Sequence, residues 1–271
     1  MMGSITIGPF AFPVGALLLF GASFIALIIG RRLGREHGAA IEMHLWKILI
    51  AGVLGARLAF VGRYWEKYKD TPLGIIDIRD GGFFAVAGLV AALAMAAWLA
   101  MRERAGRKPL LLAALAGLLV WIGGMAASLL FYTGTPDLPE LTLTRLDGSR
   151  IEMKSFAGKP VVLNLWATWC PPCRREMPAL RDAQINNPDI VFVFANQGEA
   201  AATVRGYLDT ERLSIDNILL DMDRQTARET GSPALPTTLF FDADGRLVNR
   251  RIGELSAATL AQRMESLRGS R

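Results

Sequence analysis

The sequence contains few nitrogen or sulfur ligands for a structural zinc ion: two cysteines and two histidines among 271 residues. The cysteines, Cys170 and Cys173, belong to one short motif, whereas His37 and His44 lie far upstream of it. A structural zinc site needs four nitrogen or sulfur ligands, so this inventory argues against zinc. A structural disulfide between such close cysteines would close almost no loop and would stabilise little. Redox chemistry is the interpretation that remains.

Charged residues are scarce in the first half of the chain. Residues 1–133 carry 13 Lys and Arg against 7 Asp and Glu, a net charge of +6, and the remainder carries 17 against 18, which together give the overall +5. The chain is 52% hydrophobic and its mean hydropathy is +0.30, too apolar for two ordinary soluble domains. The basic excess fits loops that flank a membrane. It does not indicate binding to nucleic acid.

Four apolar segments have about the length that a bilayer requires. We expect membrane-spanning helices at about residues 7–30, 41–61, 82–101 and 110–132. No Lys or Arg precedes the first segment, which therefore does not look like a signal peptide. Basic residues follow the first span and separate the third from the fourth: Arg31, Arg32, Arg35, Arg102, Arg104, Arg107 and Lys108. The positive-inside rule then predicts that these loops are cytoplasmic and that both tails lie outside, an N-out, C-out orientation.

The side of the membrane on which the second loop lies is less clear, because this loop also carries basic residues: Arg63, Lys67, Lys69 and Arg79. Arg57 falls inside the second predicted span, where a charge is costly. A functional role, an ion pair with Asp80, or snorkelling toward the membrane interface would each account for Arg57.

The second half of the chain has the pattern of a separate domain. A polar, turn-rich segment at residues 134–139 predicts a linker between a membrane domain, 1–133, and a second domain, 140–271. A hairpin with Asp147-Gly148 at its turn is expected first. Strands are then expected at 161–166, 190–195, 217–221, 237–241 and 247–252, and helices at 174–185, 199–211, 223–229 and 256–267. This alternation is typical of an α/β fold with helices packed on a central sheet.

The two cysteines lie between a strand-like run, Val161–Trp166, and the helix expected from Arg174. The first sulfur should then lie at the helix N-terminus, where unpaired N–H groups and the helix dipole stabilise a thiolate. The second lies within one helical turn and can close a short disulfide. The pattern predicts a dithiol/disulfide redox pair.

This half resembles the thioredoxin superfamily and, within it, the TlpA/ResA-like thiol–disulfide oxidoreductases. The matching residues are Asn164–Pro178, Gly198-Glu199, Leu235–Leu247 and Gly253. The resemblance implies a central mixed sheet flanked by helices, with Cys170 as the attacking thiolate and Cys173 as the resolving thiol. It also implies a cis-proline beside the disulfide at Pro236. Other residues expected to support the site are Trp169, which would cover the disulfide, Pro171 and Pro172, which remove two N–H donors, and Thr237.

The chain departs from many thioredoxins at a position where they bury an aspartate. Asn164 stands there and cannot act as a base. Glu176 and Glu199 are the candidates to take the proton from Cys173, although Glu176 is equally well explained as a solvated acid on the helix surface.

The first half resembles prolipoprotein diacylglyceryl transferase, most clearly over Leu54–Leu89, and also at Ile7-Gly8-Pro9. Matching positions are Gly55, Arg57, Phe60, Val61, Asp80, Gly81 and Gly82. Val86 stands where that family has its catalytic histidine, which argues against transferase activity. The resemblance implies a shared helical scaffold that could hold a lipid.

Together these features predict an oxidoreductase anchored in the cytoplasmic membrane, with its thioredoxin-like domain on the periplasmic or extracytoplasmic side. We expect it to reduce protein disulfides, as TlpA/ResA relatives do in cytochrome c maturation, with no cofactor beyond the Cys170–Cys173 disulfide. The spans contain no cysteine, so a DsbD/CcdA-like membrane reductase is the expected electron donor. Membrane lipid is the other expected partner. A dithiol oxidase, a lipid- or lipoprotein-binding protein, and a plain anchor remain alternatives, because the sequence does not set the direction of electron flow.

Overall fold

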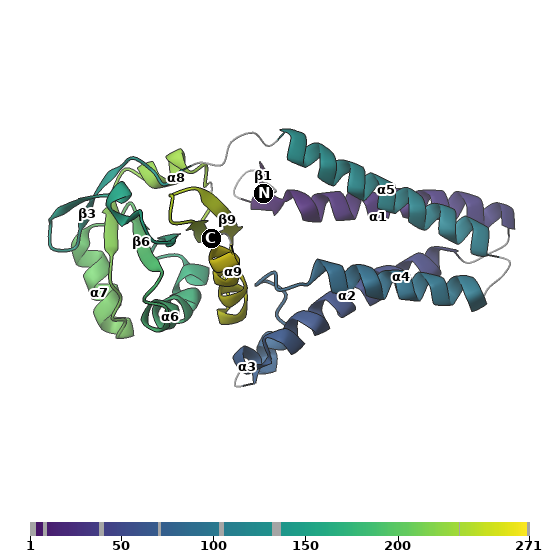
Figure 1. Ribbon diagram of the computed structural model, residues 1–271, viewed down its shortest axis with the longest axis horizontal. Coiled ribbons are helices and arrows are strands. Elements are labelled where there is room, and N and C mark those ends of the chain that lie inside the picture. Colours follow the sequence, from purple (N-terminus) through teal and green to yellow (C-terminus); the bar gives the residue numbers. More distant parts are fainter. Residues whose placement is uncertain are drawn as a thin grey trace.

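The computed structural model has two parts joined end to end, a set of four long helices and a mixed α/β unit (Figure 1). The structure describes residues 4–7, 10–37, 41–69, 72–102, 106–131, 137–232 and 234–269. We refer to residues up to 131 as the N-terminal half and to those from 137 as the C-terminal half. The chain begins with an antiparallel pair of short strands, β1 (Ser4–Ile7) and β2 (Phe10–Pro13).

The four long helices are α1 (Val14–His37), α2 (Ile41–Arg63), α4 (Ala85–Arg102) and α5 (Arg107–Phe131). Each is long and apolar enough to cross a membrane. The predicted start of the first span, at residue 7, is wrong, because β2 occupies residues 10–13. The helix begins directly after Pro13, since proline lacks an N–H donor and its ring clashes with a preceding helical turn.

These helices pack in two pairs, α1 against α5 and α2 against α4 (Figure 1). Small residues bring the second pair close together. A Cβ atom built on Gly55 would lie 2.5 Å from Cβ of Ala91, and one on Gly88 would lie 2.8 Å from the carbonyl oxygen of Gly52. Backbones that approach this closely gain van der Waals contact along the helices, which is how helices associate where the hydrophobic effect cannot drive them together.

The C-terminal half is built on a seven-stranded sheet of order β4-β3-β7-β6-β5-β8-β9. The strands are β3 (Thr142–Arg145), β4 (Arg150–Glu152), β5 (Val161–Trp166), β6 (Val191–Gln197), β7 (Ile218–Asp221), β8 (Thr237–Phe241) and β9 (Leu247–Ile252). The three central strands, β5, β6 and β7, run parallel, and the outer strands pair antiparallel. The helices are α6 (Pro171–Asn186), α7 (Ala201–Glu211), α8 (Gln225–Glu229) and α9 (Ala257–Gly269). The expected mixed sheet flanked by helices is confirmed.

Strand β5 is buried on both faces, which explains its nearly continuous apolar sequence. Val162 and Trp166 pack into the cluster that includes α6, α7 and α9. Leu163 and Leu165 point to the opposite cluster. Because side chains alternate along a strand, Asn164 lies on the α6 face, where β8 places Thr238 directly beside it.

The predicted linker, 134–139, is too long at its C-terminal end. Leu138 is only 3% exposed and its N–H donates to the carbonyl oxygen of Gly245 at 2.8 Å. Asp137 forms a β-bridge with Arg246. Residues 137–139 therefore belong to the C-terminal half, because Leu138 is part of its core. Residues 134–136 lie outside the described part of the chain.

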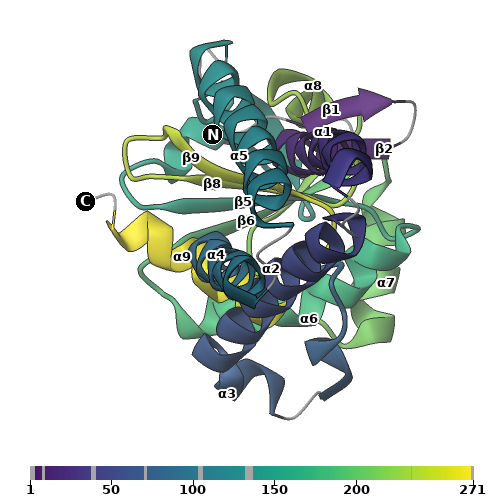
Figure 2. The ribbon, with the colours of Figure 1, turned by 90° about the vertical axis from the view of Figure 1, so that its right-hand side faces the viewer.

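The two halves meet where α9 lies across the C-terminal end of α2 and the start of α4. Both perpendicular views show this arrangement (Figures 1 and 2). Between α2 and α4 run α3 (Trp65–Tyr68) and a 3-10 turn (Pro72–Ile75). Phe60 and Tyr64 pack against Ala258 of α9 in one buried cluster. The hydroxyl of Tyr64 also donates to Oε2 of Glu265 at 3.0 Å. The C-terminal half is thus seated on the N-terminal half as well as tethered to it.

Candidate active site

The two cysteines form a disulfide at the N-terminus of α6, with their Cα atoms 5.3 Å apart. Cys170 is the N-cap residue, and its sulfur accepts a hydrogen bond from the N–H of Cys173 at 3.3 Å. Pro171 and Pro172 occupy the first turn, where a missing N–H costs the helix no hydrogen bond. Both cysteine side chains are almost fully buried. The helix start therefore places the N–H of Cys173 and the positive end of the helix dipole at the Cys170 sulfur.

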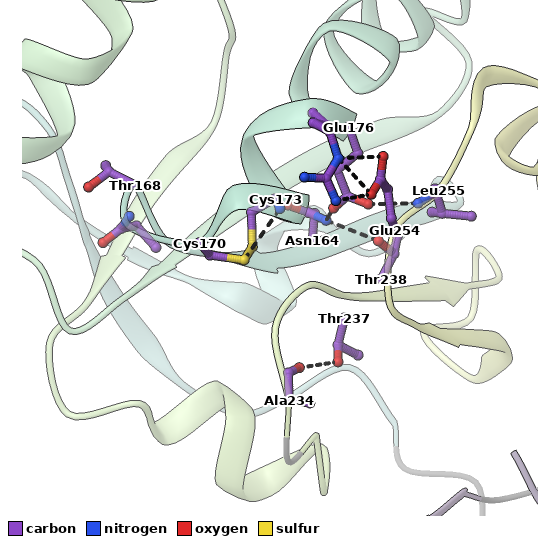
Figure 3. The surroundings of a disulfide bond; sticks show 12 residues. Asn164, Thr168, Cys170, Cys173, Glu176, Ala234, Thr237, Thr238, Glu254 and Leu255 are labelled. Atoms are coloured by element: carbon purple, nitrogen blue, oxygen red, sulfur yellow. Dashed lines mark hydrogen bonds and ion pairs between the residues drawn. A yellow bond between two sulfur atoms is a disulfide. The ribbon is translucent and has the colours of Figure 1, made fainter. Parts of the chain in front are cut away.

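A cis-proline turn adjoins the end of β5 from which the cysteine motif emerges. The Leu235–Pro236 peptide is cis, and Thr237 pairs with Leu165 in the sheet. The hydroxyl of Thr237 donates to the carbonyl oxygen of Ala234 at 2.6 Å, closing the turn (Figure 3). The carbonyl oxygen of Pro236 accepts from the N–H of Gly253 at 2.8 Å.

Glu176 is buried one helical turn beyond Cys173, and only 1% of its surface is exposed. Its Oε1 accepts from Nδ2 of Asn164 at 2.8 Å, and its Oε2 accepts from the N–H of Leu255 at 2.9 Å (Figure 3). Nδ2 of Asn164 also donates to Oγ1 of Thr238 at 3.0 Å. The alternative of a solvated acid on the helix surface is therefore wrong.

Burial raises the pKa of Glu176 to about 8, because the charged form loses its hydration. The N–H of Leu255 and the amide of Asn164 oppose this shift by stabilising the carboxylate, but they do not cancel it. This value is close to the ordinary pKa of a cysteine thiol, about 8.5. Perturbed acids of this kind concentrate at functional sites.

Glu199 has a different position from Glu176. Its carboxylate accepts from the N–H of Thr168 at 2.8 Å, from the hydroxyl of Thr168 at 2.5 Å and from Nδ2 of Asn196 at 2.7 Å. Thr168 lies in the turn that leads into Cys170, so Glu199 holds the shape of that turn. Trp169, the residue after Thr168, is 61% exposed at the rim of the site.

Arg57, the charged residue of the second predicted span, is buried and fully occupied within the chain. Its Nη1 donates to Oδ1 of Asp80 at 3.0 Å, which makes the ion pair that the sequence offered as one explanation. The remaining donors go to the carbonyl oxygens of Gly74, Ile75, Asp77 and Gly82, at 2.7 to 3.0 Å. A guanidinium has five N–H groups, and here all five have acceptors. Arg57 thereby folds the segment between α2 and α4 around itself.

Sequence reasoning did not identify two members of the site, Thr238 and the backbone N–H of Leu255. Both act through atoms whose positions depend on strand pairing and on the loop after β9, and no residue type in the sequence marks them. Within the described ranges, no group of three or more His, Cys, Asp or Glu is arranged to hold a metal ion.

Two family models match the chain, one over each half. The Redoxin model matches residues 133–263. The prolipoprotein diacylglyceryl transferase model matches residues 3–128.

Several curated proteins and solved structures are similar to about half of the chain. The thiol-disulfide oxidoreductase ResA of Bacillus thuringiensis (strain Al Hakam) is 30% identical over 120 residues, which cover 44% of this chain and 69% of ResA. The thioredoxin-like protein YneN of Bacillus subtilis (strain 168) is 31% identical over 131 residues, covering 47% of this chain and 76% of YneN. A solved structure, that of a secreted Mycobacterium tuberculosis disulfide oxidoreductase homologous to E. coli DsbE, is 29% identical with a TM-score of 0.43, covering 47% of this chain and 96% of that one.

The disulfide at the start of α6, the mixed sheet beneath it and the similarity to ResA agree with one another. The first half adds four apolar helices and a match to a membrane transferase family. The chain belongs to the ResA-like thiol–disulfide oxidoreductases.

Proposed function

We propose that this enzyme reduces protein disulfides on the outer face of the cytoplasmic membrane, where its four apolar helices anchor it. One observation carries the chemical part of this proposal: a buried carboxyl group, Glu176, lies one helical turn from Cys173 and has a pKa close to that of a thiol. Such a group gives the second cysteine a proton acceptor that Asn164 cannot provide.

In the proposed cycle the reduced enzyme attacks a client disulfide with the thiolate of Cys170, which is stabilised by the start of α6. A Cys170–client disulfide forms and one client sulfur leaves as a thiolate. In the fraction of molecules in which Glu176 is ionised, Cys173 then passes its proton to that carboxylate and attacks the sulfur of Cys170. The mixed disulfide breaks, the second client sulfur leaves, and the Cys170–Cys173 disulfide forms. Two electrons have moved from the enzyme dithiol to the client.

The remaining site residues have supporting roles in this proposal. Asn164 holds the carboxyl of Glu176 in place, and Glu199 holds the turn before Cys170. The cis-proline turn at Pro236 and Thr237, next to the end of β5 that leads to the cysteine motif, guides the client chain toward the disulfide. Trp169, exposed at the rim, offers the client an apolar contact.

The charge distribution supports an extracytoplasmic C-terminal half. Arg31, Arg32 and Arg35 near the end of α1, and Arg102, Arg107 and Lys108 at the ends of α4 and α5, lie at the end of the helices away from the C-terminal half (Figure 1). Of the basic residues in the second loop, which lies near the C-terminal half, Arg63, Lys69 and Arg79 have acidic partners. Lys69 pairs with Glu66 at 2.5 Å and Arg79 pairs with Asp77 at 2.6 Å. By the positive-inside rule the far end is cytoplasmic.

Because the predicted spans contain no cysteine, electrons cannot cross the bilayer through thiols of this chain. A membrane reductase of the DsbD/CcdA kind is the proposed donor. The clients are proteins with accessible disulfides, as in cytochrome c maturation.

The test is the redox state of Cys170 and Cys173 in growing cells, measured by acid quenching and thiol alkylation. A reductase with its donor keeps the pair mostly reduced, and a fully oxidised pair would instead support a dithiol oxidase. A Cys173→Ser variant should accumulate Cys170–client mixed disulfides, which identify the clients. A Cys170→Ser variant is its matched control and should accumulate none.

A second candidate function, lipid or lipoprotein binding by the N-terminal half, is favoured by the match to the transferase family over residues 3–128. Val86, at the position of the family's catalytic histidine, argues against transferase activity but leaves lipid binding open. One observation weighs against binding. The donors of Arg57 are all occupied within the chain, so Arg57 has none left for a lipid phosphate. Failure to recover lipid or lipoprotein with the purified protein would count against this function.

A further inference from the structure

Three consecutive residues after β9, Glu254, Leu255 and Ser256, connect the active-site helix to the N-terminal half. Glu254 accepts from Nη2 of Arg175 on α6 at 2.6 Å. The N–H of Leu255 donates to Oε2 of Glu176 at 2.9 Å. We call residues 254–256 the bridge.

The third bridge residue makes the contact to the other half. The hydroxyl of Ser256 donates to Oδ2 of Asp80 at 2.9 Å. Asp80 is itself held from several sides, by Nη1 of Arg57 at 3.0 Å, by the N–H of Gly82 at 3.0 Å and by the hydroxyl of Tyr68 at 2.8 Å. A carboxylate with this many partners is a rigid point of attachment, because moving it would break several hydrogen bonds together.

A second contact lies immediately beside the bridge. Nη2 of Arg251, near the end of β9, donates to the carbonyl oxygen of Arg79 at 2.6 Å. Gly81 has a φ of +68°, and a Cβ atom there would lie 2.4 Å from Nη1 of Arg251. Glycine at this position therefore permits both the turn and the close approach of the arginine. The two contacts hold the chain on both sides of Gly253.

We infer that Asp80 is a positioning residue for the dithiol: through Ser256 it fixes the bridge, and the bridge in turn fixes the carboxyl group of Glu176 beside Cys173. The inference rests on the proton-accepting role proposed for Glu176. It assigns the N-terminal half a part in the chemistry beyond anchoring, because a residue between its helices α2 and α4 sets the surroundings of the active site.

The effect on the reaction has a definite direction. The N–H of Leu255 stabilises the ionised form of Glu176, and this lowers the pKa of that carboxyl. Without the hydrogen bond from Ser256 to Asp80, the bridge would hold the N–H of Leu255 less firmly against Glu176. The carboxyl of Glu176 would then be a weaker acid and would ionise at higher pH. The charged groups that act on it from neighbouring elements, Glu254 from the bridge and Arg251 from β9, would remain.

The experiment measures how fast the reduced full-length enzyme reduces a saturating protein disulfide, as a function of pH. In Ser256→Ala and in Asp80→Asn the pH of half-maximal rate should rise by about 0.5 to 1 unit, the change that one hydrogen bond supports. The double variant should shift no further than either single variant, because both break the same contact. Tyr64→Phe is the matched control. It removes another hydrogen bond between the halves, to Glu265, and should leave the profile unchanged.

Glu176→Gln, measured in parallel, separates this inference from the proposed function. If Glu176→Gln alters the profile and the Ser256 and Asp80 variants do not, the inference is wrong and the role of Glu176 stands. If Glu176→Gln also leaves the profile unchanged, the proton-accepting role is wrong and the inference falls with it. An equal shift in Tyr64→Phe would show a general effect of docking and would overturn the specific role of Asp80. Should Asp80→Asn not fold, Ser256→Ala against Tyr64→Phe decides the question.

Discussion

Arg57 in the N-terminal half and Glu176 in the C-terminal half are both buried ionisable side chains, but the protein compensates their charges to different degrees. Arg57 has a carboxylate partner and an acceptor for each of its five donors. Glu176 has two neutral donors, from Asn164 and Leu255, and its pKa rises to about 8. A fully paired buried charge keeps its protonation state and serves the structure. An incompletely paired one is close to gaining or losing a proton, and can serve a reaction.

The largest expected effect tests whether Cys170 in the C-terminal half is the attacking thiol. Cys170→Ser should reduce the rate at which the purified enzyme reduces a protein disulfide to the uncatalysed rate, because a serine hydroxyl cannot form a mixed disulfide. The rate is followed by the appearance of client thiols. Residual catalysis in Cys170→Ser would mean that Cys173 can attack clients directly.

The next effect tests whether Arg57 is structural. Arg57→Ala should destabilise the N-terminal half by about 3–5 kcal/mol, because it leaves the buried carboxylate of Asp80 without its cation. The measurement is the unfolding of the full-length protein in detergent. Arg63→Ala is the control: its contact with Glu265 is 3.9 Å long and exposed, and its loss should cost about 1 kcal/mol or less. A stable Arg57→Ala protein that has lost lipid binding would make Arg57 a ligand-binding residue instead.

The third effect tests the incomplete compensation of Glu176 through pH. The folded carboxyl keeps its proton up to about pH 8, whereas in the unfolded chain it ionises near its ordinary pKa of 4.5. Between these values unfolding releases a proton, so the free energy of unfolding of the oxidised protein should fall as pH rises, by at most about 1.4 kcal/mol per pH unit. Glu176→Gln should remove this slope.

Urea unfolding across that pH range, followed by tryptophan fluorescence, measures the slope. Glu229→Gln, which alters an exposed acid, should retain it. An unchanged slope in Glu176→Gln would mean that Glu176 is ionised in the folded protein at neutral pH.

The smallest expected effect concerns packing in the N-terminal half. Gly55→Ala should destabilise the protein by about 1–3 kcal/mol relative to Gly62→Ala, because the new methyl group meets Ala91 and pushes α2 from α4. Gly62 lies in the same helix with nothing within 4 Å of an added Cβ, so it measures the gain in helix propensity alone. Thermal unfolding in detergent compares the two. Disulfide reduction should be unaffected in both variants, and a loss of activity in Gly55→Ala would show that α2–α4 packing reaches the dithiol.

Much of the architecture could be read from local patterns. Strand β5 follows from an apolar β-branched run, and the redox pair follows from two cysteines at a strand-to-helix junction. These features depend on residues close together in the chain, so their physical causes are visible in short windows. Two helix starts beside prolines differ from the expectation: α6 begins at Pro171 rather than Arg174, and α1 begins at Val14, after Pro13, rather than at residue 7.

The properties that distinguish the site arise from contacts between distant residues. Glu176 and Leu255 are 79 positions apart, and Asp80 and Ser256 are 176 apart. Nothing in a window around Glu176 distinguishes a buried acid from an exposed one, because the groups that contact its carboxyl, Asn164 on β5 and Leu255 in the bridge, come from other parts of the chain. In the same way, Arg57 had three explanations in the sequence, and the folding of residues 74–82 around its guanidinium selected one of them. Composition and spacing thus predicted thiol–disulfide chemistry. The tertiary packing determined the surroundings of each buried ionisable side chain, Arg57 and Glu176.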